Sequence, residues 1–229
     1  MAPLVLLLAE FLFLSYNPLL PYNGPNLHLS TFQVTLENAS RWIITRNNPA
    51  GQLTAFLVFD GWTNINDLLL AVATVACLLL WVPQDGRKFL GWSFLASTNI
   101  AGLVSPSMVY LFPLSDFGNW GMSAATFGAL CFGATGSAVV LRYAFATFAT
   151  REGNTQYRRP RNFLPLFFTL ALFLVSLEYL QGMASADPVV QAVHLASAAV
   201  GGLVGLAVIA KIGWVERKRG GRLFAFPAY

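Results

Sequence analysis

Long runs of apolar residues, separated by short polar connections, dominate the pattern of this chain. A helix that crosses a bilayer needs about 20 mostly apolar residues. The pattern predicts six such helices, at about 3–20, 64–83, 89–112, 119–141, 163–183 and 188–210. The first is the weakest because it contains Glu10 and Pro18, but it lacks the basic start and the cleavage site of a signal peptide.

The chain shows no repeat of 20–50 residues, and we expect one domain over residues 1–229. The expected fold class is all-α: a polytopic membrane protein built as a bundle of six transmembrane helices. One connection is long, at 22–63, and it is partly apolar around Trp42 and Phe56. Such a segment is typical of one that lies in the membrane interface.

Composition supports the membrane assignment. Only 10% of the residues are charged and 56% are hydrophobic, with a mean hydropathy of +0.59, whereas a soluble domain carries about 25% charged residues. These values exclude a soluble enzyme, a nucleic-acid-binding protein and a disordered chain. Cys77 and Cys131 lie inside apolar runs, so we expect them to pack rather than to bind metal or form a disulfide. No metal or organic cofactor is expected.

The basic residues predict the orientation. Twelve of the 14 Lys and Arg residues lie in three segments that six spans place on one side: the 87–88 connection, residues 142–161 and the tail after 210. Because basic residues stay cytoplasmic, we expect a multi-pass protein of the cell membrane with both termini in the cytoplasm. The 22–63 loop and the turns at 113–119 and 184–187 then face outward.

Two expected helices carry small residues on one face, and each also carries a residue that could do chemistry. The helix at 119–141 is rich in Gly and Ala around Ser123, and it includes Gly121 and Gly128. In the last helix, His194 shares a face with Gly201 and Gly205. Small residues let membrane helices pack closely, so we expect these two helices to touch.

Ser123 and His194 are expected at similar depths, roughly 5 and 9 Å below the outer surface at ~1.5 Å per residue. An imidazole can take the proton of a Ser hydroxyl and so make it a nucleophile. No carboxylate lies close to His194 in sequence, which favours a dyad over a triad. Two structural alternatives stay open: Ser123 can bond back to a carbonyl of its own helix, and His194 can bond across helices.

These residues resemble the rhomboid family of intramembrane serine proteases. The stretch Gly121-Met122-Ser123-Ala124-Ala125-Thr126-Phe127-Gly128-Ala129-Leu130 is similar to the family's Gly-x-Ser-Gly-x-x-Tyr-Ala-Leu, and the stretch that contains His194, Ser197 and Gly201 is similar to His-x-x-Gly-x-x-x-Gly. The basic turn at 85–90 and, in reversed order, Arg41-Trp42 also resemble family features. The similarity covers about residues 41–205.

The resemblance implies a role for each matching residue. Ser123 would be the nucleophile, His194 the general base, and Phe127 the aromatic ring that stacks on the His. The backbone N–H of Ser123 would donate to the oxyanion, and Asn66 or Asn64 would supply the side-chain donor. The sequence departs from the pattern where Ala124 and Ser197 replace Gly, where Phe127 replaces Tyr, and where the second helix lacks its His-x-x-x-Asn.

Three functions remain open at this point. The first is a serine endopeptidase that cleaves single-span membrane proteins in the bilayer near its outer face. The second is a catalytically inactive rhomboid-like protein that binds membrane clients. The third is a small transporter or channel, although the chain shows neither the repeated halves nor the broken helices that are typical of transporters. A nucleic-acid partner is not expected.

The orientation can be tested by cysteine accessibility in a variant that lacks Cys77 and Cys131. A single Cys at Asn154 should resist an impermeant maleimide that is added from outside, because the basic loop around it is expected in the cytoplasm. A single Cys at Ser115 or Ser185 should react. The reverse labelling pattern would contradict the charge argument and would place Ser123 and His194 toward the cytoplasm.

Overall fold

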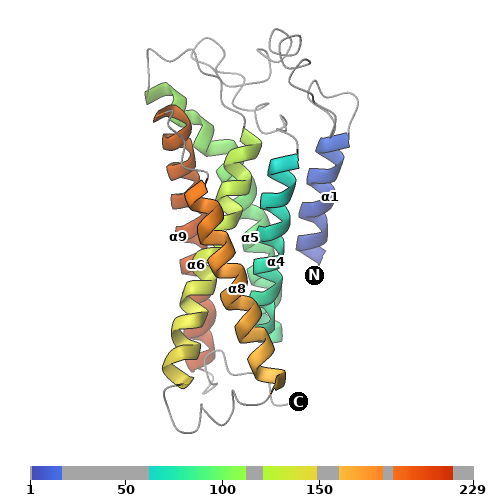
Figure 1. Ribbon diagram of the computed structural model, residues 1–229, viewed down its shortest axis with the longest axis vertical. Helices are drawn as coiled ribbons and strands as arrows, with labels where there is room; N and C mark the ends of the chain where they lie inside the picture. The colour runs from blue at the N-terminus through green and yellow to red at the C-terminus, as the bar shows by residue number, and fades with distance from the viewer. Residues whose placement is uncertain (1, 17–61, 112–120, 149–159, 183–187, 219–229) are drawn as a thin grey trace.

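The computed structural model describes residues 2–16, 62–111, 121–148, 160–182 and 188–218, and these residues are helical throughout apart from one short turn. Figure 1 shows the helices side by side in one bundle. They are α1 (Ala2–Tyr16), α4 (Trp62–Trp81), α5 (Gln84–Val104), the 3-10 helix η2 (Ser105–Leu111), α6 (Gly121–Phe148), α8 (Pro160–Gly182) and α9 (Pro188–Lys218). The all-α prediction is therefore confirmed for the described part of the chain.

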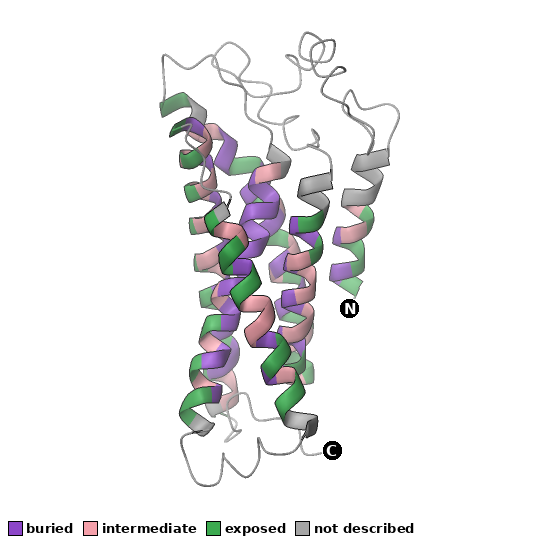
Figure 2. Cartoon of the chain, viewed as in Figure 1, coloured by how far each residue is buried: buried purple, intermediate pink, exposed green. Residues whose placement is uncertain are grey.

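Successive α-helices alternate in direction, so that α4, α6 and α9 run the same way (Figure 1). The helix α6 lies at the centre, and all of residues 124–134 on it are buried (Figure 2). Its neighbours are α4, α5, α8 and α9. We call the end at which α4, α6 and α9 begin the Ser123 end of the bundle.

Three helical stretches in the described residues are long and apolar enough to cross a membrane: Ser123–Ala146, Phe163–Gln181 and Pro188–Glu216. A shorter apolar stretch, Asn66–Trp81, belongs to α4. Large apolar side chains remain exposed along α8, including Phe163, Phe167, Phe168 and Leu174. Extended apolar surface of this kind is rare on monomeric soluble proteins, and it is compatible with a protein that sits in a membrane.

Each expected span overlaps one α-helix, but several helix ends differ from the predicted ones. The helix α5 begins at Gln84, before the basic pair, because Pro83 precedes it as N-cap. Beyond Val104 the chain continues as η2, where Pro106 cannot donate the hydrogen bond of an α-helix. The helices α6 and α9 continue for seven and eight residues past their predicted ends. Arg142 and Lys211 end the charge-free runs of the sequence, but Arg and Lys are good helix formers and do not end a helix.

Other expectations fall on segments outside the described residues. These are the long loop at 22–63, the turns at 113–119 and 184–187, the basic loop at 151–161 and the last residues of the first span, 17–20.

The contact between α6 and α9 is a contact of backbones. A Cβ atom added to Gly201 would overlap the carbonyl oxygen of Gly128 and would lie 2.7 Å from its carbonyl carbon. One turn further on, a Cβ added to Gly205 would lie 2.8 Å from the carbonyl oxygen of Phe132. Only glycine fits at these two positions of α9, so the face of small residues that the sequence predicts is the face that packs on α6.

Hydrogen bonds fix the outer helices. Trp81 Nε1 on α4 donates to Thr169 Oγ1 on α8 at 2.9 Å, and the hydroxyls of Thr74 and Ser176 lie 3.4 Å apart between the same two helices. The amide of Asn99 on α5 donates to a carboxylate oxygen of Glu10 on α1 at 3.4 Å. Each of these contacts joins polar side chains of two different helices, which helps to hold the helices together.

Substitution of Gly201 by Leu should destabilise the bundle by about 1–3 kcal/mol or more, because overpacking forces the two backbones apart. The matched control is Leu203→Ala on the same helix, since Leu203 is 67% exposed and packs little. Thermal unfolding of the purified protein in detergent measures both effects. A Gly201→Leu protein with an unchanged Tm would show that the α6–α9 contact is not as close as described.

Candidate functional site

Ser123 lies in the first turn of α6, at the point where this helix enters the packed interior. It is half-buried, whereas the residues that follow it are fully buried. Thr126 Oγ1 donates to the carbonyl oxygen of Ser123 at 3.0 Å, so Thr126 satisfies its own hydroxyl inside the helix. The backbone N–H groups of a first turn point toward the N-terminal end of the helix. The N–H of Ser123 therefore points toward the end of the bundle at which α6 begins.

His194 lies in the second turn of α9 and its ring packs against Phe127 of α6. The two rings are parallel within 6°, with 4.7 Å between their centroids. His194 is half-buried, and its Nδ1 atom is shielded from solvent. The stack fixes the plane of the imidazole at the interface of α6 and α9, one turn along α6 from Ser123.

The register of the two helices gives the relative depth of Ser123 and His194. Gly201 lies opposite Gly128, and Gly205 lies opposite Phe132, with the same offset in sequence. If this offset continues toward the Ser123 end, Ser123 lies level with the residue of α9 two positions after His194. Ser123 and His194 then differ in depth by about 3 Å along the helix axis. The two residues therefore lie at similar depth on touching helices. A direct contact between Ser123 Oγ and the imidazole stays a prediction.

The small residues around the site have structural roles. Ser197 is buried, and its hydroxyl donates to the carbonyl oxygen of Val193 at 2.8 Å, within α9. The carbonyl oxygen of Ser197 would lie 3.3 Å from a Cβ at Gly128. Gly121 is the first residue of α6. These residues let α6 and α9 approach closely. Ser123 and His194 are the side chains of this region that could take part in a reaction.

On α4, the first turns carry the two Asn residues that were expected to donate to an oxyanion. Asn66 is exposed, and the side chain of Asn64 lies outside the described residues, so this role stays a prediction. The inward residue is Asp67, which is 0% exposed. Sequence reasoning missed it, although Asp67 shares a helical face with the buried residues Ala71, Thr74 and Leu78, and that spacing could have identified it.

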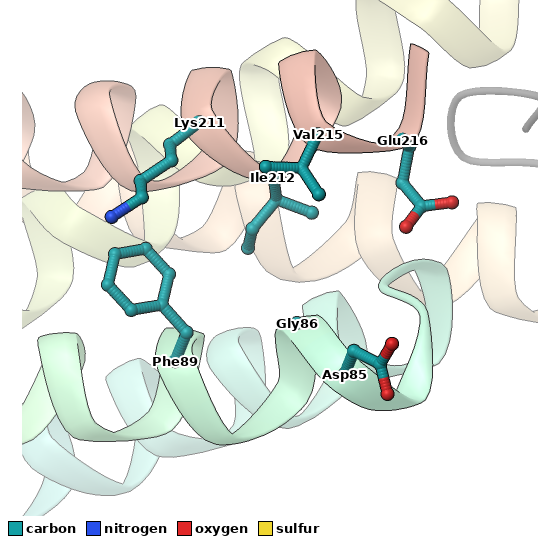
Figure 3. Close-up of a pocket in the computed structure, with 7 residues that line it drawn as sticks. All are labelled: Asp85, Gly86, Phe89, Lys211, Ile212, Val215 and Glu216. Carbon is teal, nitrogen blue, oxygen red and sulfur yellow. The ribbon is translucent and has the colours of Figure 1, made fainter. Parts of the chain in front are cut away.

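A hollow lies at the opposite end of the bundle, between the start of α5 and the end of α9 (Figure 3). It measures about 160 Å³ and places Asp85 and Glu216 at one end and Lys211 at the other. The ammonium of Lys211 lies 4.5 Å from the centroid of the Phe89 ring, which partly lines the hollow. These residues belong to the start of α5 and the last turns of α9, at the opposite end of the bundle from Ser123, so the hollow is a separate feature.

No group of three or more His, Cys, Asp or Glu residues in the described part of the chain could hold a metal ion. Cys77 and Cys131 are both unpaired and lie on different helices.

The stack on His194 can be tested by NMR of the imidazole. A parallel ring at this distance shifts the carbon-bound imidazole protons upfield, so Phe127→Leu should move the His194 signals toward their random-coil position while Phe127→Tyr should keep them shifted. Leu keeps most of the apolar volume and removes only the ring. The His28 signals serve as the internal control. Identical His194 signals in all three proteins would exclude the stack.

Comparisons with family models, with curated proteins and with solved structures find no match for this chain. The resemblance to the rhomboid family therefore stays a prediction from the sequence.

Proposed function

We propose that this protein is an intramembrane serine protease with a six-span rhomboid-like fold, in which Ser123 is the nucleophile and His194 the general base. The observation that carries the proposal is the stack of Phe127 on His194 next to the turn that holds Ser123. Phe127 belongs to the same helix as Ser123 and holds the plane of the imidazole. A general base needs such a fixed position to accept the proton of the Ser hydroxyl.

The reaction follows from these positions. Ser123 Oγ attacks the carbonyl carbon of a peptide bond while His194 takes the hydroxyl proton, and the electron pair of the carbonyl moves to its oxygen. The backbone N–H of Ser123 donates to that oxyanion, and Asn66 or Asn64 is the candidate side-chain donor from the sequence pattern. His194 then gives its proton to the leaving amine. Water next attacks the acyl-enzyme while His194 takes a proton from it, and His194 returns that proton to Ser123 Oγ as the acyl group leaves.

The substrates in this proposal are single-span membrane proteins, and the bilayer is the surrounding medium. An intact helix hides its carbonyls in its own hydrogen bonds, so a substrate has to unwind at the cleavage site. With both termini in the cytoplasm, the Ser123 end of the bundle lies in the outer half of the membrane. Cleavage then takes place near the outer face, where water can reach the site.

A fluorophosphonate probe tests the proposal, because it reacts covalently with an activated Ser. The folded protein in detergent should be labelled, and both Ser123→Ala and His194→Ala should lose the label. Ser137→Ala is the matched control, since Ser137 is another buried Ser of α6, and it should be labelled like the unmodified chain. A folded protein that takes no label would favour the inactive client-binding alternative instead.

A further inference from the structure

Asp67 is a carboxyl group buried without a partner. It is 0% exposed, and neither of its carboxylate oxygens has a hydrogen-bond partner. Among the buried side-chain atoms without partners in the described residues, its two oxygens are the only ones from a carboxyl group. Burial of an ionisable group in an apolar helix is costly, and such a group in a membrane span usually has a function.

The packing of α4 on α6 sets the direction of Asp67. A Cβ at Gly133 of α6 would lie 3.1 Å from Thr74 Cγ2, and a Cβ at Gly136 would lie 2.7 Å from Leu78 Cδ1. Asp67 is on the same face of α4, seven residues before Thr74. In this register it faces α6 near Thr126, within one turn of Ser123. Because helical side chains lean toward the N-terminus, its carboxyl group leans toward Ser123.

The polar neighbours of Asp67 are already satisfied. The Thr74 hydroxyl donates to the carbonyl of Leu70 at 2.8 Å, and the Thr126 hydroxyl donates to the carbonyl of Ser123. Because its oxygens make no hydrogen bond, Asp67 does not orient the imidazole of His194 and is not the third member of a triad. Asp67 is therefore a buried polar side chain that is available to form a hydrogen bond with a ligand atom.

We propose that Asp67 is a neutral carboxylic acid that donates its O–H to the oxyanion formed when Ser123 attacks a peptide carbonyl. This inference rests on the proposed function. An apolar site keeps a carboxylic acid neutral and makes it a hydrogen-bond donor, whereas an anion there would repel the oxyanion. As the bond from Ser123 Oγ to carbon forms, the Ser proton moves to His194, and the carbonyl electron pair moves to the oxygen that Asp67 contacts.

Asp67 keeps its proton throughout the reaction. When the intermediate collapses, the C–O double bond forms again, the C–N bond breaks and His194 protonates the amine. Asp67 is therefore a catalytic residue that lowers the energy of the intermediate by hydrogen bonding alone. Donors of this kind accelerate acyl transfer by about 10²–10³-fold. Asn66, the neighbour of Asp67 in the same turn, is exposed, whereas Asp67 is buried.

The test uses the full chain in detergent and measures the rate at which the fluorophosphonate labels Ser123, since the phosphonyl oxygen needs the same donors. Asp67→Ala should slow labelling by about 100-fold or more. Asp67→Asn should stay within about 10-fold of the unmodified protein, because its amide N–H replaces the O–H donor. Leu69→Ala is the matched control on the same helix, since Leu69 is 48% exposed, and it should label at the full rate.

Thermal unfolding separates this role from a structural one. Both Asp67 variants should keep the Tm of the unmodified protein or exceed it, since no partner is lost. Labelling of Asp67→Ala at the full rate would overturn the role of Asp67 and leave the proposed function intact. Equally slow labelling of Asp67→Asn and Asp67→Ala would overturn the donor role, as would a clear fall in Tm in both. Absence of label on the folded unmodified protein would instead remove the proposed function, and this inference with it.

Discussion

The close approach of α6 and α9 at Gly128 and Gly201 is the constraint on which the rest of the site depends. No side chain separates the two backbones there, and a second contact one turn away, at Gly205, prevents α9 from sliding or rotating. Because a helix is stiff over a few turns, this clamp also fixes the position of His194, seven residues before Gly201. The stack of Phe127 on the imidazole follows from that fixed geometry.

Polar groups inside the bundle are satisfied by two means. Several hydroxyls return to carbonyls of their own helix, as those of Thr74, Thr98 and Ser197 do. Others bond across helices, as between Trp81 and Thr169. Asp67 makes neither kind of bond, and the hydroxyls of Ser97, Ser105 and Ser137 also lack a partner. Among these four residues, Asp67 is the one with a carboxyl group.

Much of the fold could be predicted from the sequence, because charge-free runs near 20 residues and faces of small residues are local patterns. The contact of the Gly201 face with α6 followed from such a pattern. The ends of α6 and α9 were predicted too early, because a single charge at Arg142 or Lys211 ends a charge-free run but does not end a helix. Asp67 was missed because its importance depends on what lies opposite it on α6, whereas Asn66 and Asn64 were singled out by residue type.

The position of Ser123 in the first turn of α6 has an electrostatic consequence. The peptide dipoles of a helix add up to roughly half a positive charge at its N-terminus, and the effect is confined to the first turn. If Ser123 is the nucleophile that we propose, the negative charge that develops beside it is stabilised by the N-terminus of α6. The helix of 28 residues that forms the packed centre of the bundle would then also contribute to the chemistry at its first turn.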